Sequence, residues 1–196
     1  MPGYPGTPAP IIKSVSSIDK DGYNEKSLFF YSHAGTHVDV PSHIIKNSKN
    51  INQYPPDKFY GSALKLTHNF QIPLNIETIK LKISEFGIPD FILLYTGWDK
   101  FWGSDNYYSS FPTPDINVVK YLSGLNLKGV GIDSLSIDPI ETNELNNHKL
   151  LLEAEIIIIE NLTKISRLPE SIFEFFCFPL NIKDGDASPV RAIAKL

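Results

Sequence analysis

The sequence predicts an α/β fold in which a mixed β-sheet is flanked by peripheral helices. Apolar runs at residues 91–95, 129–132 and 155–159 are typical of strands that are buried on both faces. Segments with helical start and stop signals lie between successive runs. The chain has 196 residues, 42% of them hydrophobic, which is enough for one domain, residues 1–196, with a substantial core.

The N-terminal part is expected to contain a loop and a β-hairpin. Residues 1–10 are rich in Pro and Gly, which favours a loop. Residues 11–18 alternate as a strand does, and Asp21-Gly22 is a hairpin turn signal. Residues 26–33 are predicted to be the partner strand, which would bring three apolar side chains to the core: Leu28, Phe29 and Phe30.

The next segment alternates between polar loops and short elements. Residues 44–59 are polar and are predicted to form a surface loop. Residues 61–67 are expected to form a strand, and His68 beyond it to be an ordinary surface histidine. The apolar spacing in residues 76–86 indicates a short helix that converts to extended chain.

Two helices are expected in the second half of the chain. Thr113 is predicted to be an N-cap, with Pro114 at the first helical position and the helix ending at Gly124. Asn143 is expected to cap the next helix, which carries His148.

An aromatic segment, residues 98–108, follows the first buried strand. Its side chains could line a pocket, form a subunit interface or pack in the core, and the sequence leaves these three interpretations open. On the first interpretation, Trp98 binds substrate.

Glu160 follows four consecutive isoleucines at the end of the third buried strand. Burying a carboxylate without a partner is costly, and ligand sites in α/β folds commonly form at strand ends. Glu160 is therefore a candidate site residue. Residues 175–182 and 190–194 are expected to form the last two strands.

The most informative stretch is residues 32–43, Ser-His-Ala-Gly-Thr-His-Val-Asp-Val-Pro-Ser-His. Its ionisable side chains all occupy odd positions: His33, His37, Asp39 and His43. Because side chains of an extended chain alternate between two faces, an extended backbone places these four on one side. The small and β-branched residues at even positions suit a packed opposite face.

We expect this stretch to be extended but bent. Gly35 disfavours a helix, and Pro41 restricts the residue before it to extended geometry. A straight strand would separate the Cα atoms of His33 and His37 by roughly 13 Å, which is too far for comfortable ligation of one ion. Gly35 permits the bulge or corner that brings them together. The stretch is therefore predicted to hold a metal ion on its concave side.

Two other interpretations of the histidine stretch stay open. A single histidine is more often a hydrogen-bonded structural residue than a metal ligand, and the cluster could also be solvated on an edge strand. Burying three histidines and an aspartate together without a cation would cost several kcal/mol, which favours the metal site. Mixed imidazole and carboxylate ligands suit Zn²⁺ or Mn²⁺.

The motif His-x-Gly-Thr-His-x-Asp-x-Pro-x-His at residues 33–43 resembles the signature of the metal-dependent cyclase/hydrolase family, which includes bacterial kynurenine formamidase and isatin hydrolase. Further blocks match in the same order: residues 57–61, 94–103, 131–134, His148 with 159–162, and 186–192. The resemblance implies a barrel-like core of the swivelling β/β/α, or cyclase-like, type.

The resemblance also implies a ligand set. His33, His37 and Asp39 match the family's first metal ligands. His148 and Glu160 match the pair that, with the aspartate as a bridge, holds a second ion in two-metal members. One or two divalent ions are therefore expected.

Other family positions concern catalysis and substrate. His43 matches the catalytic histidine, which is not a primary ligand. Tyr4 stands where the formamidases carry a tryptophan that lines the substrate pocket, so Tyr4 is a predicted substrate contact, although it could also lie in a loose terminus. Leu135 stands where proline is common. The family usually opens with a strand carrying Asp-Leu-Ser/Thr-His, and that strand is expected to be missing here.

Composition argues against several partners. The net charge is −4 and no basic cluster occurs, so no nucleic-acid partner is expected. The longest aliphatic run, residues 156–159, is far too short to cross a membrane, and no signal peptide is visible. Cys177 is the single cysteine, which predicts a reducing, cytoplasmic compartment.

The residues of the histidine stretch predict a hydrolase that uses metal-activated water. The family resemblance implies an arylformamidase-like enzyme that acts on a carbon–nitrogen bond in a small aromatic or cyclic amide or formamide. Water activated by the metal would attack the carbonyl, with His43 as general acid and base. A lactone hydrolase, a cyclase or lyase, and a non-catalytic metal- or ligand-binding protein are the alternatives. The resemblance implies a homodimer or homotetramer.

Overall fold

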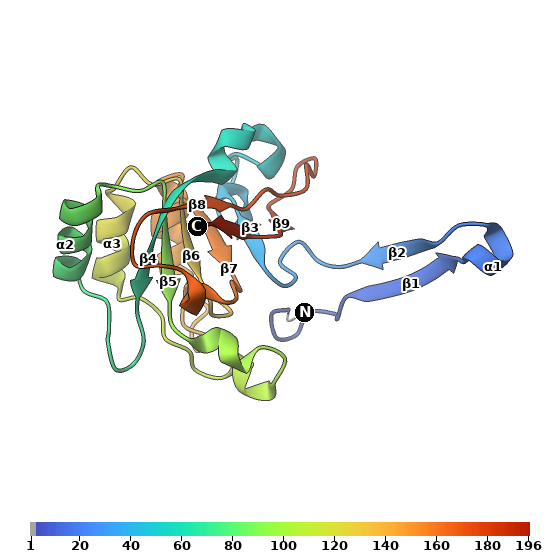
Figure 1. Cartoon of the computed structure of the whole chain (residues 1–196), viewed down its shortest axis with the longest axis horizontal. Coiled ribbons are helices and arrows are strands. Elements are labelled where there is room, and N and C mark those ends of the chain that lie inside the picture. Colours follow the sequence, from blue (N-terminus) through green and yellow to red (C-terminus); the bar gives the residue numbers. More distant parts are fainter. Residues whose placement is uncertain (1–2) are drawn as a thin grey trace.

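The structure, a computed structural model, describes residues 3–196. Met1 and Pro2, which belong to the predicted N-terminal loop, lie outside the described residues. Eight strands form one curled sheet and two more form a separate ribbon (Figure 1). The ribbon consists of β1 (Ile11–Ser16) and β2 (Glu25–Phe29), joined through a short helix, α1 (Ile18–Asp21). The strands of the sheet are β3 (His37–Asp39), β4 (Tyr60–Thr67), β5 (Phe91–Tyr95), β6 (Gly129–Ile132), β7 (Ile157–Glu160), β8 (Phe173–Phe176), β9 (Ala187–Pro189) and β10 (Ile193–Lys195).

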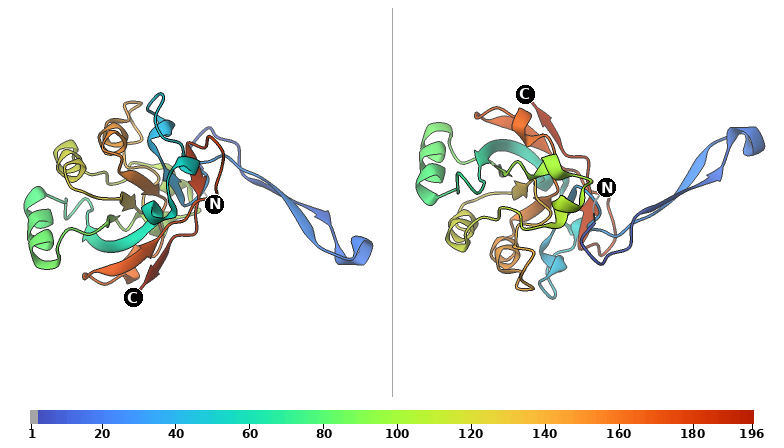
Figure 2. Two further views of the ribbon diagram at one scale, coloured as in Figure 1. Left: turned by 90° about the horizontal axis from the view of Figure 1, so that it is seen from above. Right: turned by 90° about the horizontal axis from the view of Figure 1, so that it is seen from below.

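The large sheet is mixed, as predicted, and curls into a half-barrel (Figure 2). Its strand order is β10-β8-β4-β5-β6-β7-β3-β9. Strands β4 to β7 are parallel, and the other strands run antiparallel to their neighbours. Parallel strands need crossover connections, and three helices supply them: α2 (Ile76–Phe86), α3 (Ile116–Ser123) and α4 (Asn146–Glu153). Within residues 3–196, no helix has both the length and the apolarity of a membrane span.

The parallel strands are buried on both faces, which explains their unbroken apolar runs. Leu64, Ile92 and Ile158 pack with the three helices on one face. Their neighbours in the chain, including Leu93 and Ile159, pack inside the curl of the sheet. The alternation with period two therefore separates two cores, one on each face of the sheet.

The helices form where their signals lie, but two boundaries differ from the prediction. Residues 76–86 are helical throughout, so the expected conversion to extended chain is wrong; Asn75 caps this helix by accepting a hydrogen bond from the backbone of Thr78. The cap of α3 is Asp115 rather than Thr113, because its carboxylate accepts from the backbone of Asn117.

The loop and strand predictions also need two corrections. Residues 44–59 are not a simple surface loop, because short 3₁₀ turns bury Ile51 and Phe59. His68 is buried rather than on the surface, since its Nδ1 accepts a hydrogen bond from the backbone of Leu74. Burial lowers the pKa of His68. Of the last two predicted strands, residues 175–182 overlap β8 and residues 190–194 overlap β10.

The predicted hairpin forms, but it does not pack on the core. All residues of β2 are exposed, with Leu28 at 61% and Phe29 at 52%, and Phe30 is only partly buried. The expectation that these three side chains enter the core is therefore wrong. An alternating pattern predicts a strand, but it carries no information about what lies against that strand.

Candidate metal centre and active site

The histidine stretch is bent at Gly35, as its spacing predicts. Gly35 has φ 67°, in the left-handed region that favours glycine. Strand β3 begins two residues later, and a 3₁₀ turn at Pro41–His43 follows it. The extended alternation therefore holds only within β3, and bends on both sides bring the ring centroids of His33 and His43 to 4.2 Å.

The register of β3 against β7 sets the next contacts. His37 pairs with Glu160, and Val38 pairs with Ile159 in the core on the opposite face. Directly opposed side chains in an antiparallel pair have Cβ atoms about 4.5–5.5 Å apart. The His37 Nε2 atom accordingly lies 3.6 Å from Oε2 of Glu160.

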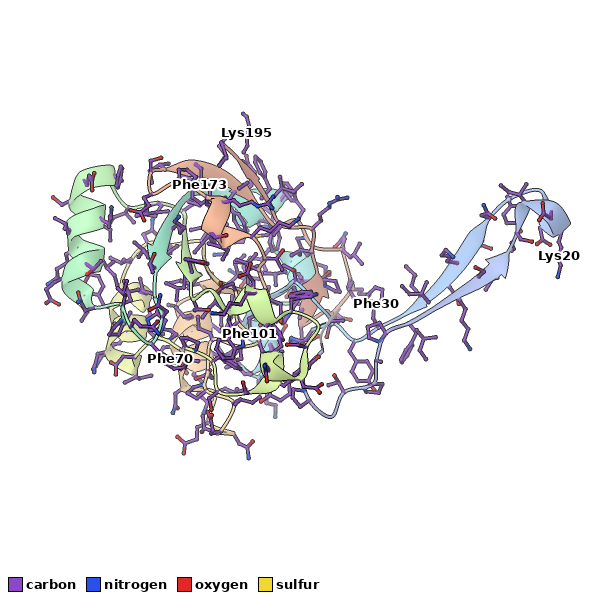
Figure 3. All side chains as sticks on the ribbon, turned by 60° about the horizontal axis from the view of Figure 1, so that its bottom comes forward. Lys20, Phe30, Phe70, Phe101, Phe173 and Lys195 are labelled. Atoms are coloured by element: carbon purple, nitrogen blue, oxygen red, sulfur yellow. The ribbon has the colours of Figure 1, made fainter. Side chains whose placement is uncertain are left out.

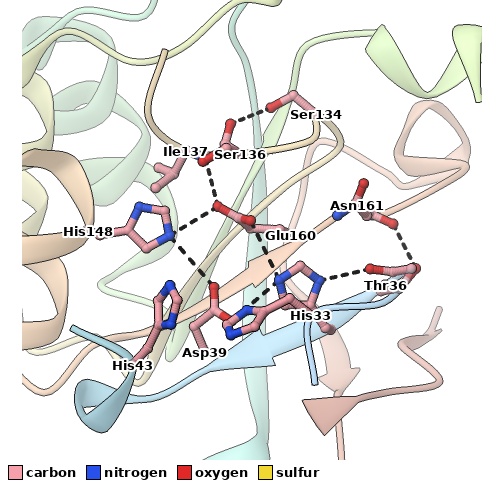
Figure 4. Close-up of polar contacts among 12 residues, drawn as sticks. His33, Thr36, Asp39, His43, Ser134, Ser136, Ile137, His148, Glu160 and Asn161 are labelled. Carbon is pink, nitrogen blue, oxygen red and sulfur yellow. Dashed lines mark hydrogen bonds and ion pairs between the residues drawn. The ribbon is translucent and has the colours of Figure 1, made fainter. Parts of the chain in front are cut away.

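Helix α4 brings His148 to the same place from the helical face of the sheet. Its Nε2 lies 3.3 Å from Oε1 of Glu160 and 3.7 Å from Oδ2 of Asp39 (Figure 4). Its Nδ1 is 2.7 Å from Oδ2 of Asp138, which orients the ring. Asp138 also accepts hydrogen bonds from the backbone of Asn147 and His148, so it caps α4 from a preceding loop in place of the predicted Asn143.

Three groups of three side chains each gather possible ligand atoms within 4.8 Å of one another. Two of them share Asp39: His33, His37 and Asp39, and Asp39, His148 and Glu160. The third is His33, His43 and Asp186. The residues of the first two groups match the predicted ligand set. We call the five residues the ligand cluster. The structure thus brings together the whole predicted ligand set, although the roles themselves stay a prediction.

Asp39 belongs to the first two groups and is fully buried. Ring nitrogens of His33 and His37 lie 2.8 Å and 3.3 Å from its Oδ1, yet neither carboxylate oxygen makes a hydrogen bond of acceptable geometry. A buried carboxylate that lacks hydrogen bonds is costly. The cluster therefore fits a divalent cation, and the shared position of Asp39 fits a bridge between two.

The ionisable groups of the ligand cluster shift one another's pKa values. Burial opposes protonation of His33, but the carboxylates of Asp186 and Asp39 at its two ring nitrogens outweigh it and raise the pKa of His33 to about 10. Burial likewise opposes ionisation of Asp39, but the surrounding histidines, led by His37, hold the pKa of Asp39 well below its usual range. Because an imidazole must lose its proton to bind a cation, metal binding here is coupled to pH.

His43 lies beside the cluster and faces Asp186. Its Nδ1 is 3.5 Å from Oδ2 of Asp186, and the same oxygen is 2.9 Å from Nε2 of His33. Sequence reasoning did not single out Asp186 as a site residue. The signal was present, because Asp186 opens the block of residues 186–192 that resembles the family.

A cavity of about 350 Å³ lies over the ligand cluster and suits a small molecule. Tyr4 and Leu135 line it together with the cluster, so Tyr4 lies where a substrate contact was predicted. Among the described residues that line the cavity, none is lysine or arginine.

Trp98 does not line this cavity. The chain turns at Gly97 (φ 73°), and the Trp98 ring then packs against Phe101 and Phe111. Its indole Nε1 donates to the backbone oxygen of Tyr107 at 3.1 Å. The assignment of Trp98 to substrate binding is therefore not supported, and packing within the chain, the third interpretation, describes its surroundings.

Asn161 is a cavity residue that sequence reasoning missed. It follows Glu160 with φ 57°, and its backbone oxygen accepts a hydrogen bond from Oγ1 of Thr36 at 2.6 Å (Figure 4). Its side-chain Oδ1 accepts from the hydroxyl of Tyr107. The only sequence signal was its place directly after Glu160, within a block already quoted for the family resemblance.

A curled mixed sheet that gathers imidazoles and carboxylates beneath a small cavity defines a metal-dependent hydrolase. Residues 1–139 match the family model described as "Putative cyclase". The chain therefore belongs to the cyclase family, as the histidine motif indicates.

Relatives span nearly the whole chain. An uncharacterised protein of Methanocaldococcus jannaschii is 34% identical over 196 residues, covering 98% of this chain and 92% of the relative. The kynurenine formamidase of Salinibacter ruber is 27% identical over 189 residues, covering 90% of this chain and 82% of the enzyme.

Solved structures share the fold. An isatin hydrolase bound to the product analogue thioisatinate aligns with a TM-score of 0.86 at 22% identity, covering 96% of this chain and 82% of that one. A potential metal-dependent hydrolase with cyclase activity aligns with a TM-score of 0.75 at 25% identity, covering 99% of this chain and 92% of that one. The cyclase-like fold expected from the motif is thus confirmed.

Proposed function

We propose that this chain hydrolyses a carbon–nitrogen bond in a small aromatic or cyclic amide or formamide. The observation that carries the proposal is Asp39, a buried carboxylate shared by two groups of ligand side chains at the wall of a small cavity. The relatives named kynurenine formamidase and isatin hydrolase support this class of bond.

The ligand cluster would hold one or two divalent ions, Zn²⁺ or Mn²⁺. His33, His37 and Asp39 would bind the first, and His148 and Glu160 would bind the second with Asp39 shared. When bound, such an ion supplies a Lewis acid that polarises the scissile carbonyl and makes water more acidic.

His43 is the proposed general base and acid. Asp186 lies near its Nδ1, which leaves Nε2 available to exchange a proton with the reactants. His43 takes a proton from the attacking water as the carbon–oxygen bond forms. It then gives that proton to the leaving nitrogen as the carbon–nitrogen bond breaks, so that the products are an acid and an amine.

The cavity supports an uncharged substrate. Its described lining lacks lysine and arginine, and its histidines are the proposed metal ligands and the proposed general base, so a free carboxylate on the substrate would find no lysine or arginine partner there. Tyr4, Tyr31 and Leu135 instead offer aromatic and aliphatic surface to a planar ring.

A hydrolysis screen tests the proposal. The protein is purified, its metal content is measured, and it is loaded with Zn²⁺ or Mn²⁺, with a chelator as control. N-formyl anilines, cyclic aryl amides, lactones and aryl esters are then assayed by product mass. We expect the amides to gain one water in a metal-dependent reaction. Turnover of lactones alone, a product with no added water, or no turnover at full metal content would each contradict the proposal.

We also propose a cytoplasmic location, a single domain over residues 1–196, and a homodimer or homotetramer. The single cysteine, Cys177, is buried and unpaired, which supports a reducing compartment.

A further inference from the structure

Leu135 lies between the cavity and a group of packed aromatic side chains. It belongs to the loop that leads from β6 to α4, and it is only 2% exposed. Phe101 marks the place of its aromatic neighbours in the molecule (Figure 3). We call the whole group the aromatic cluster: Trp98, Phe101, Trp102, Tyr107, Tyr108, Phe111, Leu135 and Ile140.

Leu135 is the member of the aromatic cluster that reaches the cavity. Among the described residues, no other member of the cluster lines it. Tyr4 and Tyr31 also line the cavity, but they are 45% and 46% exposed and have room to move. Of the described apolar lining residues, only Ala34 and Leu135 are buried, and Leu135 is the larger. Leu135 therefore gives the cavity a wall with tight packing behind it.

Hydrogen bonds on both sides of Leu135 fix it relative to the ligand cluster. Before it, the backbone oxygen of Ser134 accepts a hydrogen bond from the backbone of Asn161 at 3.0 Å. After it, the backbone of Ile137 donates to Oε1 of Glu160 at 2.8 Å (Figure 4). Because Glu160 is a proposed metal ligand, the distance from the metal centre to this wall is set by the fold.

A fixed wall limits the size of the ring system that fits. The cavity holds about 350 Å³, which is near the lower end of the range for small-molecule sites, roughly 300–1,000 Å³. Leu135 has little room to yield, because Tyr107 behind it is fully buried and close-packed surroundings resist extra atoms. A difference of one methylene in an apolar pocket changes specificity by about 10–200-fold.

We propose that Leu135 limits the substrate to one benzene ring and excludes a naphthalene ring system. This inference rests on the proposed function and narrows its class of substrate. Shortening Leu135 would join the cavity to new space beside Tyr107 and Phe111. An apolar space of this kind stays dry and takes up small apolar groups. Truncation should therefore admit larger rings rather than only weaken binding.

The test compares formanilide with N-(2-naphthyl)formamide, which differ by one fused benzene ring. We measure kcat/KM for both substrates with zinc-loaded wild type, Leu135→Ala and Leu122→Ala. Leu122→Ala is the matched control, because Leu122 is fully buried in the core on the helical face and does not line the cavity. We expect the naphthyl-to-phenyl ratio of kcat/KM to rise at least about tenfold in Leu135→Ala. The ratio should not change in Leu122→Ala.

A binding measurement distinguishes a failure of this inference from a failure of the proposed function. Acetophenone and 2-acetonaphthone carry the same two ring systems on a carbonyl group, but neither has a carbon–nitrogen bond to hydrolyse. Isothermal titration of zinc-loaded protein gives their affinities, and Leu135→Ala should shift their ratio in the same direction. If no formamide is hydrolysed but this shift is found, the proposed function is overturned and the role of Leu135 is supported.

Two further variants keep the inference falsifiable if Leu135→Ala fails to fold. Leu135→Val removes a single methylene and should shift both ratios in the same direction by a smaller factor. Leu135→Met keeps the volume of the side chain and should retain the ratios of wild type. A wild type that accepts both ring systems equally, unchanged ratios in Leu135→Val and Leu135→Ala, or an equal shift in Leu122→Ala would overturn the inference.

Discussion

The hydroxyl of Tyr107 donates a hydrogen bond to Oδ1 of Asn161 across 2.7 Å, and this bond joins the aromatic cluster around Trp98 to the cavity wall. Both side chains are buried. With its oxygen engaged, the carboxamide of Asn161 has only its amino group to offer to a molecule in the cavity. A fixed donor of this kind can stabilise negative charge that develops on a substrate oxygen.

We therefore expect Tyr107→Phe to lower kcat/KM about tenfold, which corresponds to about 1.4 kcal/mol. The variant leaves Oδ1 of Asn161 without its donor, so the carboxamide can turn. Steady-state kinetics with a small amide checks this, and Tyr108→Phe is the matched control. Unchanged kinetics, or loss of metal from Tyr107→Phe, would contradict the expected role.

Replacing His43 with alanine should lower kcat by at least about a hundredfold, the usual contribution of a general acid or base. Metal content should stay near that of wild type, because His43 belongs to neither of the two groups that share Asp39. Elemental analysis measures the metal content of the variant, and steady-state kinetics measures its kcat. Loss of metal would make His43 a ligand instead.

Replacing His33 or Asp39 with alanine should strip metal from the protein. Each removes a member of a three-residue group, and Asp39→Ala removes the residue shared by both. Elemental analysis after dialysis against a weak chelator measures the loss. We expect Asp39→Ala to lose more metal than His33→Ala, and full occupancy in both variants would refute the ligand assignment.

Asp138→Asn should weaken metal affinity by about 10–100-fold while the ligands themselves stay in place. The carboxylate orients His148 through Nδ1 and also caps α4. Isothermal titration with Zn²⁺ gives the affinity. Asn143→Ala is the control, because Asn143 does not cap this helix, and its metal affinity should equal that of wild type.

The metal-free protein should lose stability as pH rises from about 6.5 to about 10. His33 has its pKa raised from 6.5 to about 10 by folding, so its contribution is complete below 6.5 and is lost as pH rises through 10. Metal affinity should rise over the same pH range, because the histidines lose the protons that compete with the cation. Urea unfolding of chelator-treated protein, with and without Zn²⁺, measures both trends. Asp186→Asn should weaken the pH dependence of stability, since Asp186 raises the pKa of His33.

Much of the ligand cluster was predictable because its geometry follows from local rules. Odd spacing places His37 and Asp39 on one face of β3, and Gly35 has the backbone conformation that a bend requires. The isoleucines before Glu160 required a buried strand, which left its carboxylate needing partners.

The residues around the cluster were not predictable by such rules. Tyr107 and Asn161 are 54 residues apart, and their contact has no periodic signature. The cap of α4 comes from Asp138 on a preceding loop, so the local signal at Asn143 was misleading. The β1–β2 hairpin was also mispredicted: its sequence indicates strands that reach the core, yet Leu28 and Phe29 lie exposed.

Strand β3 is paired on both sides, with β7 and β9, while much of the cavity wall comes from loops that include Tyr4, Tyr31 and Leu135. A slip of one residue in β3 would turn His37 and Asp39 away from the site, so the register of β3 must be kept. Loops accept replacement far more readily. The pairing of β3 must therefore stay constant, whereas the loops that line the cavity can change. Substrate specificity can thus diverge during evolution while the proposed metal ligands stay the same.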